Sequence, residues 1–230
     1  MHAVMVAAGI LISRALGVVR ESLKARYLGA TGSLAADAFN AAFRIPNILN
    51  NLLGEGSLSA SFIPVYSRLL AKGDPKEADR VAGAVGALLG LISAVLVLLG
   101  ILSAPLLVSL IAAGFEGERR ALAIQLTRIL FPGAALFVFG AWCIGILNSH
   151  RRFFLSYAAN GAWNVAMIAA LVMYRNDAPV DIAMKLAWAS VIGAALLFAI
   201  QLPVVLRVAP LVRPNLGRGS EAVRTGRAVR

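Results

Sequence analysis

Runs without a charged residue dominate this chain after about residue 80. Four of them cover residues 81–115, 129–150, 153–174 and 186–206. Each is at least as long as the roughly 20 apolar residues that cross a bilayer as an α-helix. Together with two more polar stretches near the N-terminus, the pattern predicts six membrane-spanning helices, at about 3–28, 34–70, 81–102, 121–147, 155–174 and 183–206. The sequence therefore predicts an all-α polytopic membrane protein.

Glycine, serine and proline mark the predicted boundaries. Gly29, Gly32 and Ser33 predict a turn after the first helix. Pro105 predicts the end of the third helix, with residues 106–113 as a short segment on the membrane surface. Four residues predict interruptions of the second helical region: Pro46, Gly54, Gly56 and Pro64. The GxxxG pair Gly86 and Gly90 predicts close helix packing within the protein rather than dimerisation.

Composition and charge agree with a membrane protein. The chain has 230 residues, of which 60% are apolar and 14% charged, and this excludes disorder and disfavours an ordinary soluble enzyme. The net charge is +11, but no basic run alternates with stacking aromatics, so we expect no nucleic-acid partner. Twelve basic residues lie in 67–80, 149–152 and 207–230, against six in the opposite loops. The positive-inside rule then predicts that both termini are cytoplasmic.

The domain organisation predicted from these patterns is simple. Residues 1–206 are expected to form one transmembrane lobe. Residues 207–230, which are basic and rich in glycine and proline, are expected to be a cytoplasmic linker that leads towards a second, C-terminal lobe.

Sequence motifs for catalysis and for metals are not found. The chain has no P-loop, HExxH or GxSxG pattern, and its cysteine and histidines, Cys143, His2 and His150, form no cluster. We therefore expect no enzyme activity, no cofactor and no metal site.

Charged residues in the first two helices carry the functional information, whereas the third, fifth and sixth helices are expected to carry little. On the first helix, Arg14, Arg20, Glu21 and Lys24 lie within an arc of about 120°. On the second, six polar residues follow steps of three or four and lie within about 80°. They are Asp37, Asn40, Arg44, Asn47, Asn51 and Glu55, here called the polar stripe.

Two interpretations of these charges stay open. Arg14, Arg20 and Arg44 would together cost about 8–10 kcal/mol if all faced lipid near the bilayer centre, so we expect them to face a polar interior. Either they pair with acids, Arg14 or Arg20 with Asp37 and Arg44 with Glu55, or they form a cationic cavity for an anion. Arginine suits phosphate and pyrophosphate because its planar fork donates two parallel hydrogen bonds.

Three segments resemble the MurJ/MviN family of bacterial lipid II flippases, within the MOP exporter superfamily. They are SRALGVVRE at 13–21, DAFNAAFRIPN at 37–47 and EGSLSASFIPV at 55–65. The resemblance implies one six-helix lobe of a two-lobed flippase in the bacterial cytoplasmic membrane, with membrane lipids around it. Its partner would be lipid II, an undecaprenyl-diphosphate-linked peptidoglycan precursor, moved across the membrane by alternating access in cell-wall biogenesis.

The resemblance also implies roles for single residues. Arg14, Arg20, Arg44 and Asn47 are expected to bind the substrate, and Asp37, Glu55 and Glu21 to gate the cavity or to pair with the arginines. One departure is clear, since Asn50 and Asn51 stand where the family often has an arginine pair. The alternatives are a related exporter of another lipid-linked oligosaccharide or of a drug, and a membrane scaffold that transports nothing.

Overall fold

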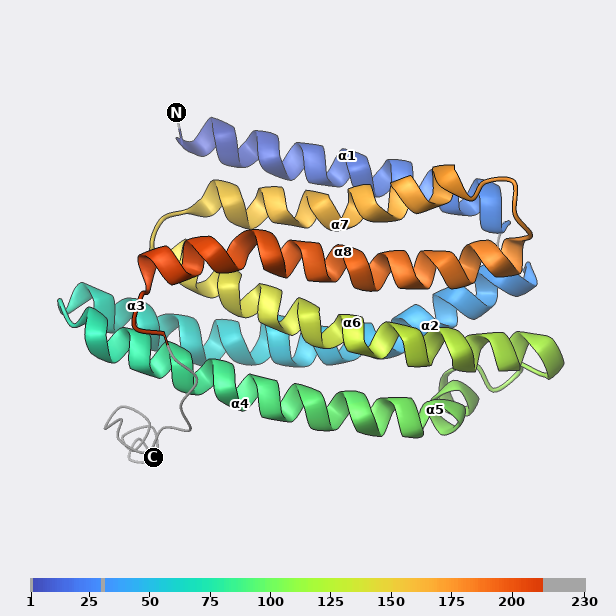
Figure 1. The fold of residues 1–230 in the computed structure, drawn as a ribbon, viewed down its shortest axis with the longest axis horizontal. Helices are drawn as coiled ribbons and strands as arrows, with labels where there is room; N and C mark the ends of the chain where they lie inside the picture. Colours follow the sequence, from blue (N-terminus) through green and yellow to red (C-terminus); the bar gives the residue numbers. More distant parts are fainter. Residues whose placement is uncertain (1, 30–31, 213–230) are drawn as a thin grey trace.

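The charge-free runs form long helices that lie along one common axis in the computed structural model (Figure 1). The structure describes residues 2–29 and 32–212, and their side chains except 2–10, 54–57, 59, 156 and 157. Residues 213–230, most of the predicted linker, lie outside it. Nine helical elements are described: α1 (His2–Leu28), α2 (Leu34–Asn50), η1 (Asn51–Phe62), α3 (Ile63–Ala71), α4 (Pro75–Leu102), α5 (Ala104–Ile111), α6 (Gly117–Ser149), α7 (Phe153–Met173) and α8 (Pro179–Val208).

The predicted turn between the first two helices is confirmed. Gly29 and Gly32 adopt φ angles of 95° and 103°, a region that favours glycine. Ser33 caps α2, because its hydroxyl accepts a hydrogen bond from the backbone N–H of Ala36 at 3.2 Å. The same hydroxyl donates to the carbonyl of Leu28 at 2.8 Å, which joins the two helix ends.

The predicted interruptions of the second helical region are wrong, because α2, η1 and α3 follow one another without a break. Pro46 lies inside α2, and Pro64 lies in the first turn of α3. Between them η1 is a π-helix, a wider helix with i→i+5 hydrogen bonds. The chain thus accommodates its breakers by changing the helix type rather than by ending the helix.

Other helices begin earlier than hydropathy predicts. Helix α4 begins at Pro75 rather than near residue 81, because the side chain of Asp74 accepts a hydrogen bond from the N–H of Glu77 at 3.1 Å and caps it. Helix α4 ends at Leu102, as predicted, and Pro105 stands in the first turn of α5, the short helix found where a short segment was predicted at 106–113. Capping residues and prolines set these starts, and the apolar run begins a turn or more later.

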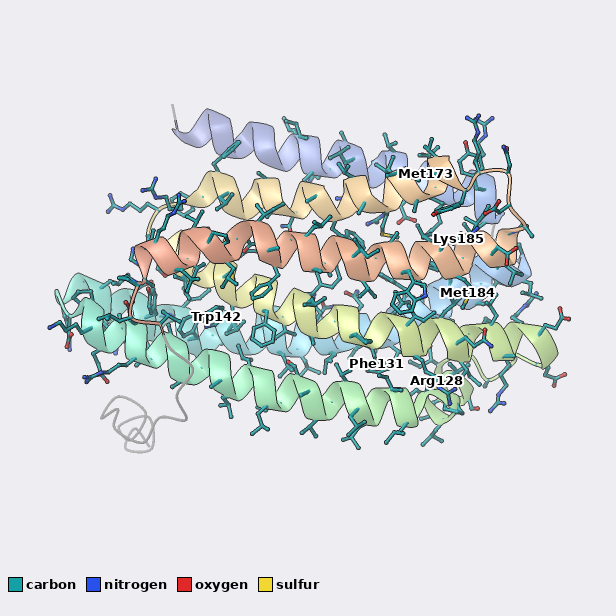
Figure 2. All side chains as sticks on the ribbon, viewed as in Figure 1. Arg128, Phe131, Trp142, Met173, Met184 and Lys185 are labelled. Atoms are coloured by element: carbon teal, nitrogen blue, oxygen red, sulfur yellow. The ribbon has the colours of Figure 1, made fainter. Side chains whose placement is uncertain are left out.

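Helix α6 is the centre of the bundle, since it packs against α8, α2 and α4. Its aromatic side chains fill space left by glycines on α4. A Cβ added to Gly100 would lie 2.1 Å from the ring of Phe131, and one added to Gly86 would lie 3.1 Å from Trp142 (Figure 2). Gly90 faces Phe139 in the same way, so the GxxxG pair packs within the chain as predicted.

The helices match a membrane environment. Among the described residues, α4, α6, α7 and α8 are long and apolar enough to cross a membrane. Helix α1 and the run from α2 to α3 extend along the same bundle, but they carry the polar residues, so six crossings stay a prediction (Figure 1). Charged side chains gather at the two ends of the bundle (Figure 2). The ends of α3 and α8 lie at one end, with the start of α1 (Figure 1).

Candidate ligand-binding site

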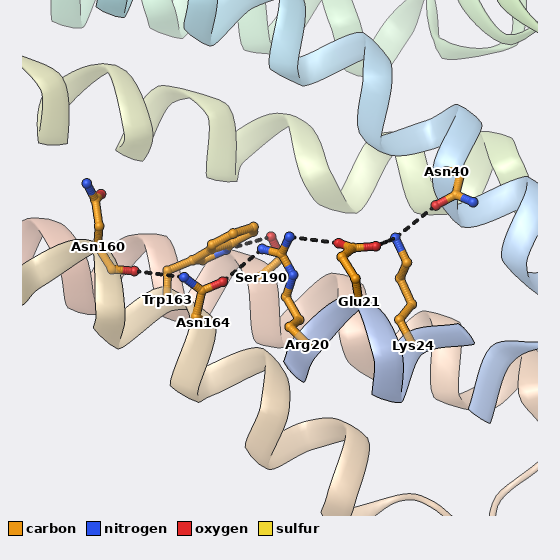
Figure 3. A network of polar contacts seen from close by, with 8 residues as sticks. All are labelled: Arg20, Glu21, Lys24, Asn40, Asn160, Trp163, Asn164 and Ser190. Atoms are coloured by element: carbon orange, nitrogen blue, oxygen red, sulfur yellow. Dashed lines mark hydrogen bonds and ion pairs between the residues drawn. The ribbon is translucent and has the colours of Figure 1, made fainter. Parts of the chain in front are cut away.

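Arg20 is the most tightly held of the predicted site residues. Its Nη1 donates a hydrogen bond to Oδ1 of Asn164 on α7 at 3.0 Å, and its Nη2 lies 2.7 Å from Oε1 of Glu21 (Figure 3). Its guanidinium carbon lies 4.4 Å from the centre of the Trp163 ring, in a cation–π contact. The side chain is 16% exposed, and among the described residues its Nε has no hydrogen-bond partner.

Lys24 extends these contacts from α1 to α2. Its Nζ lies 2.6 Å from Oε2 of Glu21 and donates to Oδ1 of Asn40 at 3.1 Å (Figure 3). Glu21 thus bridges two cations, Arg20 and Lys24, with one carboxylate. The polar contacts run without interruption from Asn164 on α7 to Asn40 on the polar stripe, and they carry one net positive charge.

The polar stripe is exposed along α2, as its spacing predicts. Asn40, Arg44, Asn47 and Asn51 are exposed, whereas Phe39 and other apolar residues between them are buried in the bundle. Two pockets lie along this face. One of about 630 Å³ is lined by Asp37, Asn40, Arg44 and residues of α5 and the loop after it, and a smaller one by Asn47, Asn50 and Ser190 among others.

Asp37 does not pair with Arg14 or Arg20, so that part of the ion-pair interpretation is wrong. Its carboxylate lies 3.5 Å from Nη1 of Arg119 at the start of α6 and accepts a hydrogen bond from the N–H of Gly32 at 3.0 Å. The reason is position: Asp37 stands in the first turn of α2, beside the glycine turn and the end of α6. Asp37 therefore joins the start of α2 to the glycine turn and to the start of α6.

The remaining predicted residues are free of ion pairs or lie outside the described side chains. Arg14 and Arg44 are exposed, and no ion pair among the described side chains involves either of them. The side chain of Glu55, on η1, is outside the description, so its pairing with Arg44 stays a prediction. The described surface of α1 and α2 thus carries two arginines without ion pairs, in addition to Arg20 and Lys24. This excess of positive charge suits an anion.

Sequence analysis missed the contribution of α7. The fifth predicted helix, at 155–174, is expected to carry little functional information, yet its Trp163 and Asn164 both contact Arg20. The sequence does contain a signal for this contact, because Asn160 and Asn164 are two amides one helical turn apart in a charge-free, largely apolar run. A polar side chain inside such a run needs a partner, and that requirement points to a buried polar contact.

Comparison with known proteins identifies the family. A family profile described as "Lipid II flippase MurJ" matches residues 24–228 of this chain. The chain belongs to the MurJ family. The matched residues include the polar stripe, whereas Arg14, Arg20 and Glu21 precede them.

Two curated MurJ relatives show the extent of the similarity. "Lipid II flippase MurJ" of Burkholderia cenocepacia is 36% identical over 209 residues, which cover 89% of this chain and 40% of that protein. "Probable lipid II flippase MurJ" of Vibrio cholerae is 34% identical over 224 residues, which cover 93% of this chain and 42% of that protein. The chain thus spans about two fifths of the length of these relatives.

A solved MurJ structure has the same fold. The chain superposes on "Lipid II flippase MurJ, inward closed conformation" with a TM-score of 0.71 and 24% identity, over 91% of this chain and 47% of that one. The predicted all-α membrane fold and the family resemblance are therefore confirmed.

Proposed function

We propose that the complete gene product containing this chain is a lipid II flippase, which moves the undecaprenyl-diphosphate-linked precursor across the bacterial cytoplasmic membrane by alternating access. Membership of the MurJ family supports the substrate. The observation that carries the proposal is the excess of positive charge on α1 and α2, where Arg20 and Lys24 share one carboxylate while Arg14 and Arg44 have no acidic partner among the described side chains.

In this proposal the arginines and Asn47 bind the diphosphate. Arg20 contributes a guanidinium already fixed by neighbours, and Arg14 and Arg44 contribute charges from exposed positions on α1 and α2. Glu21 holds Arg20 and Lys24 together when no anion is bound. Asp37, paired with Arg119, and Glu55 control the opening of the cavity at different heights along the second helical run.

The N-terminus is cytoplasmic in this proposal. The described parts of the arginine- and lysine-rich segments, 67–80, 149–152 and 207–212, come at the same end of the bundle as the start of α1 (Figure 1). The positive-inside rule places that end in the cytoplasm. The anion would then enter from that side, between α1 and α2 and a second lobe.

Complementation tests the proposal directly. A bacterium depleted of its own lipid II flippase is supplied with the complete gene, either unchanged or with Arg14→Ala, Arg20→Ala or Arg44→Ala. We expect the unchanged gene to restore growth and the arginine variants to fail at equal membrane abundance. A matched control is Arg175→Ala, which should leave growth intact. It removes an arginine from the loop between α7 and α8, at the end of the bundle opposite the proposed cytoplasmic end.

The outcomes separate the family's function from the site. Failure of the well-expressed unchanged gene would contradict the lipid II proposal and favour another lipid-linked substrate or a scaffold. Growth of both the unchanged gene and the arginine variants would leave the flippase proposal standing and contradict the proposed site.

A further inference from the structure

Two residues of α7 face Arg20 and have no assigned role. We propose that Trp163 and Asn164 are positioning residues, which hold the Arg20 guanidinium in one orientation for the anionic group of the ligand. The inference rests on the proposed function, because it requires that Arg20 contacts that group. It adds α7 to the site, since the earlier assignments all lie on α1 and on the run from α2 to η1.

Asn164 fixes the guanidinium at one edge. Its Oδ1 accepts the hydrogen bond from Arg20 Nη1 at 3.0 Å, and its Nδ2 donates to the carbonyl of Asn160 at 3.4 Å (Figure 3). The second bond decides which way the amide points, because Nδ2 is the group that can donate to a carbonyl. The oxygen is thereby reserved for Arg20.

Trp163 fixes the guanidinium at one face. The indole ring covers that face at 4.4 Å, so an anion can approach only at the other face or at the edge. Glu21 and Asn164 occupy two of the five N–H groups of an arginine. Three N–H groups remain, and the Nε–H among them is buried without a partner among the described residues, so a ligand oxygen reaches it only when the surrounding side chains move.

The indole itself is held by three other helices. Its Nε1 donates to Oγ of Ser190 on α8 at 3.1 Å (Figure 3). Phe43 of α2 stacks on it at 6.0 Å between ring centres, and Phe137 of α6 meets it edge-on at 5.5 Å. Gly193 of α8 allows this fit, since a Cβ there would lie 2.8 Å from Cδ1 of Trp163.

The orientation of Arg20 therefore depends on packing among α2, α6, α7 and α8. This arrangement predicts that substitutions at Trp163 and Asn164 weaken anion binding through Arg20 and not independently of it. Residues that only stabilise the bundle would affect binding whether or not Arg20 is present.

The test measures binding of undecaprenyl diphosphate to the complete gene product in lipid nanodiscs. We expect Asn164→Ala and Trp163→Leu to raise the Kd by about tenfold, since each removes a contact to a charged group. Trp163→Phe keeps an aromatic face over Arg20 and should recover most of the affinity. Trp188→Leu is the matched control, because Trp188 is an α8 tryptophan that is 56% exposed, and its Kd should not change.

The same substitutions in an Arg20→Ala background decide the mechanism. We expect each to change the Kd by less than about twofold there, because the group that they position is gone. Equal effects in both backgrounds would overturn the proposal, as would wild-type affinity in Asn164→Ala. Asn164→Ala removes only a small amide, so it keeps the test decisive if Trp163→Leu does not fold.

Failure of the proposed function has a different result. If the unchanged protein does not bind undecaprenyl diphosphate, or if Arg20→Ala binds as tightly as the unchanged protein, the assumed role of Arg20 is wrong and the positioning role is overturned with it. If Arg20→Ala loses affinity while Asn164→Ala and Trp163→Leu do not, only the positioning role is overturned.

Discussion

The guanidinium of Arg20 lies over the indole ring of Trp163, with 4.4 Å between its carbon and the ring centre. The two residues are on helices separated by most of the chain, and their contact joins the charged α1 to the apolar α7. A charge that would be costly in lipid is thus covered by an aromatic face and held by hydrogen bonds to Asn164 and Glu21. The contact can be tested by substituting Arg20, Trp163 and Asn164 one at a time.

Asp37 should contribute to stability rather than only to function. Asp37→Ala removes the acceptor for the N–H of Gly32 and the ion pair with Arg119, so we expect a loss of about 1–2 kcal/mol in the free energy of unfolding. Asp37→Asn keeps a hydrogen-bond acceptor and should lose about half as much. Unfolding in detergent, followed by circular dichroism, measures both. Equal losses in the two variants would contradict the role assigned to the Gly32 hydrogen bond.

The contact between Gly100 and Phe131 should not tolerate a methyl group. A Cβ at Gly100 would lie 2.1 Å from the Phe131 ring, so Gly100→Ala should destabilise the protein by about 1–3 kcal/mol through overpacking. Adding Phe131→Leu should recover part of the loss. Gly114→Ala is the control, since nothing lies within 4 Å of a Cβ there. Melting temperatures of the three variants compare these effects, and an unchanged value for Gly100→Ala would show that α4 and α6 pack less closely than described.

His150 should make stability depend on pH. It lies in the turn between α6 and α7, with Nε2 2.9 Å from the hydroxyl of Tyr66 and with Asp79 and Arg152 nearby. Burial lowers the pKa of His150 below its ordinary value of 6.5, against the opposing attraction of Asp79. The folded protein then binds fewer protons than the unfolded chain, so the stability from neutral His150 is complete above that value and is lost as pH falls through the lowered pKa.

The measurement for His150 is the melting temperature between about pH 7.5 and pH 5. We expect the unchanged protein to lose more stability over this range than His150→Gln, which can still form a hydrogen bond to Tyr66. Parallel curves for the two proteins would contradict the assignment.

An arginine at position 51, two turns further along the polar stripe, should be able to replace Arg44. If Arg44 supplies charge that the family often takes from the positions of Asn50 and Asn51, Arg44→Ala should lose complementation and Arg44→Ala with Asn51→Arg should regain it. Both residues are exposed, so the second change adds no buried charge. Growth of the depleted strain measures the effect, with Arg44→Ala and Asn51→Lys as a test of whether charge alone suffices. No recovery in either double variant would show that Arg44 acts from its own position only.

The spacing of the polar residues predicts which helix faces are exposed, but it does not predict which side chains contact one another. The steps of three and four from Asp37 to Asn47 place these residues on one face, because that spacing follows from the geometry of the α-helix itself. The partner of Asp37 depends instead on which helix end lies opposite its first turn, and that is Arg119, which is 82 residues away in sequence. Trp163 was missed for the same reason, since its contacts to Phe43, Phe137 and Ser190 come from three other helices.

Hydropathy predicts the bodies of the helices but not where they begin. The apolar run after residue 80 predicts the body of α4, but Asp74 and Pro75 decide where the helix begins. Pro46 and Gly54 are ordinary signals of interruption, yet a change to π-helical hydrogen bonding carries the helix past them. Local chemistry can be anticipated from a motif, whereas the tertiary contacts that favour a continuous helix cannot.

The placement of α1 has a consequence for how the protein is made. Helix α1 packs extensively against α7 and hardly at all against α2, its neighbour in sequence. Asn164 follows Arg20 by 144 residues, so the ribosome synthesises six further helical elements, from α2 to α6, before α7 and this partner exist. Until then the arginine has only Glu21 and water to satisfy it. Helix α1 is translated before α7 and therefore has to wait for its main packing partner, so co-translational insertion must keep a charged helix at the membrane while most of the bundle is still being completed.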